Sequence, residues 1–245
     1  MRLYGLIGKS LTHSFSKGYF TEKFAAEGIT DCRYESFEIT SIDELPALLE
    51  ANPDLCGLNV TIPYKELVLP FLHDRSEEVK AIGACNCIRI ENGRLGGFNT
   101  DASGFRASIA PRLQPHHQKA LVFGSGGASK AIQYALREMN IDHRIVSRKG
   151  QPGEMGYEDI DDVVLRNYTL LINTTPLGMY PNIDNDPPLP YEYLGPEHFL
   201  YDVIYNPAQT KFLRQGAEKG ATTLNGHEML IGQAEESWAI WNSTK

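Results

Sequence analysis

The stretch ALVFGSGGASKAIQYALREMNIDHRIVSRK, residues 120–149, decides the fold of the second half of the chain. It begins with a short apolar run and passes through a glycine-rich turn. Apolar residues then recur at helical spacing, at Ala131, Ile132, Ala135, Leu136 and Met139. A second apolar run, residues 143–147, follows. This order predicts a strand, a tight turn, a helix and a second strand, which together form the βαβ unit of a nucleotide-binding fold.

The turn after the first strand predicts a phosphate-binding loop, formed by Gly124, Ser125, Gly126, Gly127 and Ala128. Gly124 permits the tight turn, and Gly126 lets the backbone approach a pyrophosphate. The N-terminus of the following helix offers free N–H groups and a positive dipole end to the same anion. Ser129 stands where the usual fingerprint has its third glycine, so the match is partial. The alternative is a tight structural turn without a ligand.

The end of the second strand carries Ser147, Arg148 and Lys149. NAD-dependent enzymes usually place Asp or Glu at this point, where the carboxylate binds the ribose hydroxyls. A guanidinium instead binds the 2′-phosphate of NADP, which a carboxylate would repel. The sequence therefore favours NADP over NAD. The alternative is a solvated turn.

Strand and helix signals also alternate through the first hundred residues. Apolar runs at 3–8, 32–39 and 57–63 predict strands, and residues 17–28 predict a helix. Asn92 and Gly93 predict the turn of a hairpin. Strands separated by helices imply a mainly parallel sheet covered on both faces. The fold class is therefore α/β with two domains, of which the second is Rossmann-like.

Polar side chains of the first half follow the predicted strands, where open α/β sheets bind ligands. They are His13, Ser14, Ser16, Asn59, Thr61, Lys65, Asn86, Asn99, Thr100 and Asp101. Taken singly, each is more often a cap, a turn former or an exposed helix-start lysine. Taken together, they suit a small, polyhydroxylated anion. Together with NADP, these residues suggest the reduction of a carbonyl group. A lysine near a carboxylate could supply the proton, and Lys65 and Asp101 are the candidates for this pair.

Composition limits the remaining choices. The chain has 245 residues, 42% of them hydrophobic, and a net charge of −8. These values argue against disorder and against nucleic acid as a general partner. The chain contains no apolar stretch of membrane-spanning length and no evident secretory signal, so we expect a cytoplasmic protein. Its four cysteines, Cys32, Cys56, Cys85 and Cys87, are expected to be reduced packing thiols and not metal ligands.

Several sequence blocks, in order along nearly the whole chain, resemble the shikimate dehydrogenase family. They are GKSLTHSFS (8–16), NVTIPYK (59–65), GFNTD (97–101), GSGGA (124–128), INTTPLG (172–178), DVIYNP (202–207) and MLIGQA (229–234). The resemblance implies reversible NADPH-dependent reduction of 3-dehydroshikimate to shikimate, in aromatic amino-acid biosynthesis. It also implies a substrate domain of residues 1–101 plus 226–245, to which the C-terminal helix returns, and an NADP-binding domain of residues 102–225.

The resemblance also assigns roles to residues at matching motif positions. Lys65 and Asp101 are the implied catalytic pair, and Ser14, Ser16 and Tyr205 the implied ligands of the substrate carboxylate. The implied ligands of the ring hydroxyls of the substrate are Asn59, Thr61, Asn86, Asp101 and Gln233. Residues 124–128 would hold the pyrophosphate and Arg148 the 2′-phosphate. Val203 and Gly226 match positions near the nicotinamide, and Glu77 matches a position sometimes counted near the cofactor.

The chain departs from the family pattern at several positions. Lys17 replaces a proline, and Cys85 and Cys87 replace valine and threonine around Asn86. The second arginine expected shortly after Arg148 is missing. Two alternatives remain: a quinate/shikimate dehydrogenase of the same family, which often uses NAD, and a non-catalytic nucleotide-binding regulatory protein on the same scaffold. We expect a monomer or a homodimer.

Overall fold

The computed structural model describes residues 1–11, 14–148 and 152–243. The chain divides into two compact units. Unit 1 comprises Met1–Thr100 and Gln233–Lys245, and unit 2 comprises Asp101–Gly232. The chain passes from unit 2 back to unit 1 between Gly232 and Gln233, inside the last helix, α9 (His227–Asn242). The C-terminal part of that helix therefore belongs to the same unit as the N-terminal strands.

Unit 1 contains a six-stranded mixed sheet in the order β2-β1-β3-β5-β6-β4. Its strands are β1 (Arg2–Gly8), β2 (Cys32–Glu38), β3 (Leu55–Val60), β4 (Asp74–Arg75), β5 (Cys87–Glu91) and β6 (Arg94–Phe98). β1 pairs in parallel with β2 and β3, whereas β5 is antiparallel to β3 and β6. The hairpin between β5 and β6 turns at Asn92 and Gly93, whose φ angles of 52° and 74° are those that Asn-Gly turns adopt.

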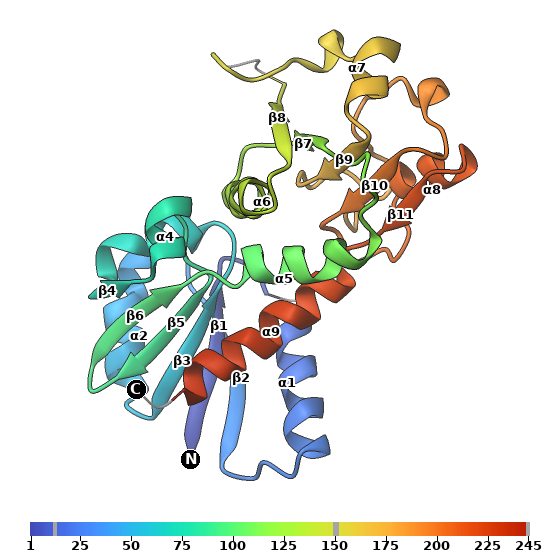
Figure 1. Cartoon of the computed structure of the whole chain (residues 1–245). Helices are drawn as coiled ribbons and strands as arrows, with labels where there is room; N and C mark the ends of the chain where they lie inside the picture. The colour runs from blue at the N-terminus through green and yellow to red at the C-terminus, as the bar shows by residue number, and fades with distance from the viewer. Residues whose placement is uncertain (12–13, 149–151, 244–245) are drawn as a thin grey trace. The chain divides into compact units, whose positions relative to one another are not determined.

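Helices cover both faces of this sheet. Successive side chains of a strand point to opposite faces, so apolar strands give each face a surface for helices to pack on. Leu3 and Ile7 of β1 join the core beneath η1 (Ile42–Glu44), α2 (Leu45–Ala51), α3 (Tyr64–Leu67), η2 (Leu69–Phe71) and α4 (Glu77–Ile82). Tyr4 and Leu6 join the opposite core with α1 (Phe15–Ala26) and α9. Figure 1 shows α1 and α9 on one face and α2 on the other.

Unit 2 contains a five-stranded, wholly parallel sheet in the order β11-β10-β9-β7-β8. The strands are β7 (Lys119–Phe123), β8 (Asp142–Val146), β9 (Leu170–Asn173), β10 (Phe199–Asp202) and β11 (Thr222–Leu224). The first strand, β7, lies between β8 and β9, so the winding direction reverses there. In parallel sheets, ligands bind beyond the carboxyl ends of the strands at such a reversal.

Helices and short turns complete unit 2: α5 (Asp101–Ile109), η3 (Ala110–Arg112), α6 (Gly127–Glu138), η4 (Tyr157–Asp159), α7 (Asp162–Asn167), η5 (Tyr191–Tyr193) and α8 (Lys211–Glu218). One core packs α7 and α8 against Leu121, Phe123 and Leu200 of the sheet. α5 packs against α6, and its Phe105 meets the buried Tyr201 ring edge to face. The α/β fold class predicted from the sequence is confirmed.

Candidate functional site

The glycine loop of unit 2 begins where β7 ends. Gly124 has a φ of +102°, in the region that favours glycine. A Cβ at this position would lie 2.8 Å from the Thr174 hydroxyl oxygen. Thr174 is held there because its N–H and its hydroxyl both donate to the Phe123 carbonyl, at 2.9 and 2.6 Å. A larger residue at 124 would therefore separate the ends of the two strands that flank the reversal.

The next part of the loop leaves space beside its backbone. Gly126 precedes the first residue of α6, and within the described chain no atom lies within 4 Å of a Cβ built on it. Ser129, in place of the third glycine, is fully buried and donates to the Gly124 carbonyl at 2.7 Å. The serine thus closes the turn by a hydrogen bond. An open backbone at the N-terminus of a 12-residue helix fits a dinucleotide pyrophosphate.

The end of β8 carries the residues predicted to select the cofactor. Ser147 is half-buried and Arg148 is exposed, while Lys149 lies outside the described residues. The Ser147 hydroxyl donates to the carboxylate of Glu154. Sequence reasoning missed Glu154, because it lies seven positions beyond Ser147, the first residue after the strand, where an acid is normally sought.

Val203 and Gly226, matched to positions near the nicotinamide, lie together in unit 2. A Cβ on Gly226 would lie 2.1 Å from the Val203 carbonyl oxygen, so only glycine fits. The Gly226 N–H donates to the Ile204 carbonyl at 3.0 Å, and Val203 donates to the Asn173 carbonyl at 3.0 Å. This backbone arrangement connects the end of β9, the end of β10 and the residue before α9. Tyr205, two residues beyond Val203, is half-buried.

A buried carboxylate supports the same strand ends. Asp202 is fully buried and accepts hydrogen bonds from Asn173 Nδ2, the Ile204 N–H and the Thr210 hydroxyl, at 3.1, 3.0 and 2.7 Å. Burial raises the pKa of Asp202 to about 6, although all three hydrogen bonds favour the charged form. Asp202 therefore fixes the turn that contains Val203.

In unit 1, polar side chains from four elements form one connected network. The Tyr34 hydroxyl donates to Asn59 Oδ1 at 2.8 Å and is also hydrogen-bonded to Ser16. Asn59 Nδ2 donates to the Ser237 hydroxyl of α9 at 2.9 Å, and Ser237 lies 3.5 Å from the Thr100 hydroxyl. Burial raises the pKa of Tyr34, so the phenol stays a neutral donor. The network brings together Ser16 and Asn59, which the sequence predicted, with Tyr34 and Ser237, which it missed.

Asn86 joins the network next to Asp101. Its Oδ1 accepts from the Thr100 N–H at 2.7 Å, and its Nδ2 donates to the Thr100 hydroxyl at 3.0 Å. Thr100 is the last residue of the first segment of unit 1, and Asp101, 1% exposed, is the first of unit 2. Asn86 therefore fixes the residue that precedes the predicted catalytic aspartate.

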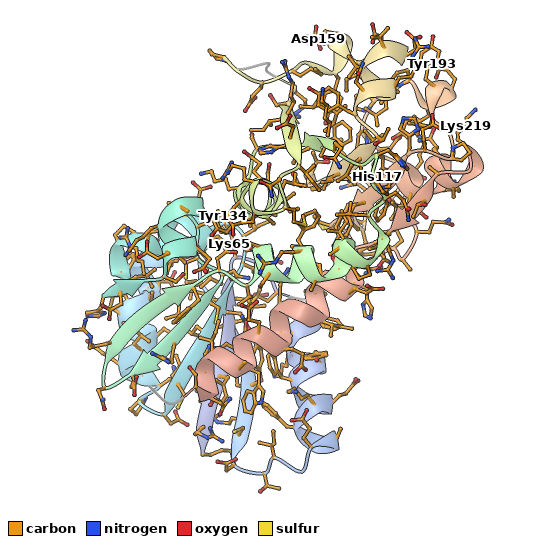
Figure 2. The ribbon with its side chains drawn as sticks, viewed as in Figure 1. Lys65, His117, Tyr134, Asp159, Tyr193 and Lys219 are labelled. Atoms are coloured by element: carbon orange, nitrogen blue, oxygen red, sulfur yellow. The ribbon has the colours of Figure 1, made fainter. Side chains whose placement is uncertain are left out.

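Lys65 is the second residue of α3 and is half-buried (Figure 2). The preceding Tyr64 is buried, and its hydroxyl donates to the Ile39 carbonyl at 2.6 Å. The Lys65 carbonyl accepts from the Cys85 N–H at 2.7 Å. These two contacts hold the short helix in place just after β3. The backbone that carries the Lys65 side chain is therefore fixed.

The remaining predicted residues of unit 1 lie at the start of α1, directly after β3, at the start of α4 and within α9. Ser14 is the N-cap of α1, but in the described chain its side chain makes no capping hydrogen bond. Thr61 follows β3 and donates its N–H to the Ile7 carbonyl at 3.0 Å. Gln233 lies one helical turn before Ser237 on α9, on the same face. Glu77 is exposed at the start of α4 and pairs with Lys80 at 2.6 Å.

The cysteines offer little chemistry of their own. Cys32, Cys85 and Cys87 are buried and Cys56 is half-buried, and none of the four, all within the described residues, is in a disulfide. Burial raises the pKa of Cys87, which keeps its thiol protonated. Among residues 1–11, 14–148 and 152–243, we find no cluster of three His, Cys, Asp or Glu side chains arranged to hold a metal ion. In that same part of the chain, no helix has the length and apolar character needed to cross a membrane.

Comparison with known proteins identifies the family. Residues 6–88 match the model of the shikimate dehydrogenase substrate binding domain. The shikimate dehydrogenase (NADP(+)) of Caldicellulosiruptor bescii is 37% identical over 258 aligned positions, which cover 98% of this chain and 89% of that protein. The chain belongs to the shikimate dehydrogenase family. The family and the NADP cofactor predicted from the sequence are thereby confirmed.

Solved members of the family share the whole fold. The shikimate 5-dehydrogenase of Thermus thermophilus, in complex with NADP(H) and shikimate, superimposes with a TM-score of 0.88 at 31% identity. The match covers 99% of this chain and 94% of that one. A quinate dehydrogenase from Corynebacterium glutamicum, in complex with NAD, gives 0.86 at 28% identity, covering 98% of this chain and 93% of that one. The fold is therefore shared by shikimate dehydrogenases and a quinate dehydrogenase.

Proposed function

We propose that the protein catalyses the reversible NADPH-dependent reduction of 3-dehydroshikimate to shikimate. The observation that carries this proposal is the polar network of unit 1. It presents amide and hydroxyl groups of the kind that bind a ring with several hydroxyls, in a chain whose curated relatives are NADP-dependent shikimate dehydrogenases. The proposed domains are residues 1–101 plus 226–245 for the substrate and 102–225 for NADP.

In unit 2, the loop of residues 124–128 would hold the pyrophosphate and Arg148 the 2′-phosphate. The open backbone at Gly126 and the exposed guanidinium support these roles. Val203 and Gly226 would support the nicotinamide through backbone atoms that already contact each other. NADPH, when bound, supplies the hydride that reduces the carbonyl carbon.

Lys65 of unit 1 is the proposed proton donor to the carbonyl oxygen in reduction and the acceptor of that proton in oxidation. Asp101 is its proposed partner, because a carboxylate favours the charged lysine. Ser14, Ser16 and Tyr205 would bind the substrate carboxylate. The ring hydroxyls would be bound by Asn59, Thr61, Asn86, Asp101 and Gln233. The network fixes the amides of Asn59 and Asn86 before substrate arrives, which lowers the cost of ordering them.

The decisive experiment mixes the purified protein with shikimate and NADP+ and follows absorbance at 340 nm. We expect an increase that depends on shikimate and that Lys65→Met nearly abolishes. No substrate-dependent change, with NADP+ still bound, would favour the non-catalytic nucleotide-binding alternative. Oxidation of quinate with NAD+ at higher kcat/KM than shikimate with NADP+ would favour the quinate/shikimate alternative. That the enzyme is a monomer or homodimer, and that it is cytoplasmic, stay predictions from the sequence.

A further inference from the structure

A carboxylate lies at the end of β8, although the residues that directly follow this strand in the sequence, Ser147 and Arg148, are not acidic. Ser147 directly follows β8, the second strand of the βαβ unit, and its hydroxyl donates to Glu154 Oε2. Because Ser147 is half-buried and so is Glu154, this contact is partly shielded from water. The end of the second strand therefore has an acidic group, supplied from a later position in the chain.

Backbone hydrogen bonds keep Glu154 in this place. The Met155 N–H donates to the Ile145 carbonyl at 2.8 Å, and the Ser147 N–H donates to the Met155 carbonyl at 3.0 Å. Val146 and Met155 form a parallel bridge along the outer edge of β8, which is the edge strand of the sheet. Glu154 precedes the bridged residue, so its position follows from strand pairing as well as from its hydrogen bond.

This acid lies at the end of β8, and β8 is the strand next to the one that the glycine loop follows. The Gly124 N–H donates to the carbonyl of Val146 at 2.9 Å, and Val146 is the residue before Ser147. In dinucleotide-binding folds, a carboxylate at the end of the second strand accepts hydrogen bonds from the adenosine ribose, and the same position meets the 2′-phosphate of NADP. Glu154 thus lies where a ribose hydroxyl would be favoured and a phosphate would be repelled.

We propose that Glu154 is a specificity-determining residue that narrows the preference of this enzyme for NADP over NAD; this inference rests on the proposed function. Arg148 and Glu154 act on the same group with opposite signs. The guanidinium attracts the 2′-phosphate, whereas the carboxylate repels it and accepts a hydrogen bond from the 2′-hydroxyl of NAD. The ratio of the NAD+ Kd to the NADP+ Kd is therefore smaller than it would be with Arg148 and no carboxylate beside it.

The test is calorimetric titration of NADP+ and of NAD+ into the wild type, Glu154→Gln and Glu154→Ala. Both variants remove the negative charge, and the glutamine keeps an acceptor for Ser147. We expect the ratio of the NAD+ Kd to the NADP+ Kd to rise about three- to thirty-fold, because water screens the half-exposed carboxylate and brings its repulsion of the phosphate toward the value for unit charges in bulk water. Glu154→Ala should also weaken NAD+, because the acceptor is lost.

Glu158→Gln is the matched control, since it removes one negative charge from the exposed η4 turn of the same segment. Its Kd ratio should equal that of the wild type. A ratio unmoved in both Glu154 variants, or moved equally by Glu158→Gln, overturns the inference. Shikimate oxidation by the wild type is measured in parallel. If it proceeds while the ratio stays unmoved, the inference alone fails; if the wild type binds neither nucleotide, the proposed function fails with it.

Discussion

The two units prepare their candidate ligand sites by different means. In unit 1 the polar groups are side chains that bond one another, as in the series Tyr34, Asn59, Ser237. In unit 2 they are backbone atoms of a loop whose shape depends on Gly124 and on the space beside Gly126. A side-chain site loses function when a chemical group is removed. A backbone site loses function when a group is added.

The largest expected effect comes from removing a group in unit 1. Lys65→Ala should lower kcat for shikimate oxidation by about 10²–10⁴-fold, the usual contribution of general acid–base catalysis. The effect on KM should be much smaller, because the lysine acts mainly in the chemical step. Lys65→Met keeps the length without the proton and should behave similarly. Steady-state kinetics across pH measures both variants.

Lys219→Met, which removes an exposed lysine at the end of α8, is the control for lost positive charge. Its kcat should match the wild type. If Lys65→Ala kept more than about a tenth of wild-type kcat, the role of proton donor would be wrong, given the expected loss of at least ~10²-fold. A large rise in KM with kcat unchanged would make Lys65 a binding residue instead.

The next effect tests how tightly the framework behind the unit 1 network is packed. A Cβ on Gly57 of β3 would lie 2.4 Å from the Trp241 indole, which also donates to the Ile88 carbonyl at 3.0 Å. Gly57→Ala should therefore destabilise unit 1 by about 1–3 kcal/mol through overpacking. Both tryptophans of the chain, Trp238 and Trp241, lie in unit 1, so urea unfolding followed by tryptophan fluorescence reports this unit.

Gly96→Ala is the matched control on β6, where the nearest atom to an added Cβ is 3.5 Å away. Its unfolding midpoint should stay close to that of the wild type. Equal midpoints for Gly57→Ala and the wild type would mean that the indole moves aside without cost.

A third variant adds a group in unit 2. Gly126→Ala should leave the thermal midpoint of the free protein nearly unchanged, because the described residues leave the site of the new methyl open. It should weaken NADP+ by about tenfold, or 1.4 kcal/mol, if the pyrophosphate lies against this backbone. Gly18→Ala on α1 adds the same methyl at another glycine with no described atom within 4 Å, and should leave the NADP+ Kd unchanged. Wild-type affinity in Gly126→Ala would place the pyrophosphate elsewhere.

Local signals made much of this structure predictable. The hairpin turn predicted at Asn92 and Gly93 depends on neighbours within a few positions, and it forms. The capping box of Ser41 and Glu44 is equally local. The glycine loop likewise follows its strand directly. Such features need only the chain's own backbone preferences, so periodicity and turn chemistry reveal them.

Long-range contacts explain what the sequence did not reveal. Ser237 meets Asn59 across 178 positions, and Glu154 reaches Ser147 through a bridge at the edge of β8. Tyr34 lies in an ordinary strand pattern and gave no sign of a polar role. Tertiary pairing, which no local pattern encodes, placed these three residues. His13 and Lys149, both singled out from the sequence, lie outside the described residues.

The smallest expected effect concerns Asp202, the buried carboxylate that supports the Val203 turn of unit 2. Its pKa in the folded protein is about 6, above the ordinary 3.8, so its stabilising contribution is complete below pH 3.8 and is lost as pH rises through 6. Asp202→Asn has no such proton. The free energy of unfolding of the wild type relative to Asp202→Asn should therefore be higher at pH 5 than at pH 7, by about 1 kcal/mol.

Hydrogen exchange in peptides from β9 and β10 measures this difference within unit 2, which contains neither of the two tryptophans. A difference of the opposite sign would mean that the three hydrogen bonds to Asp202 outweigh its burial, and that the carboxylate holds the Val203 turn as a stabilised anion.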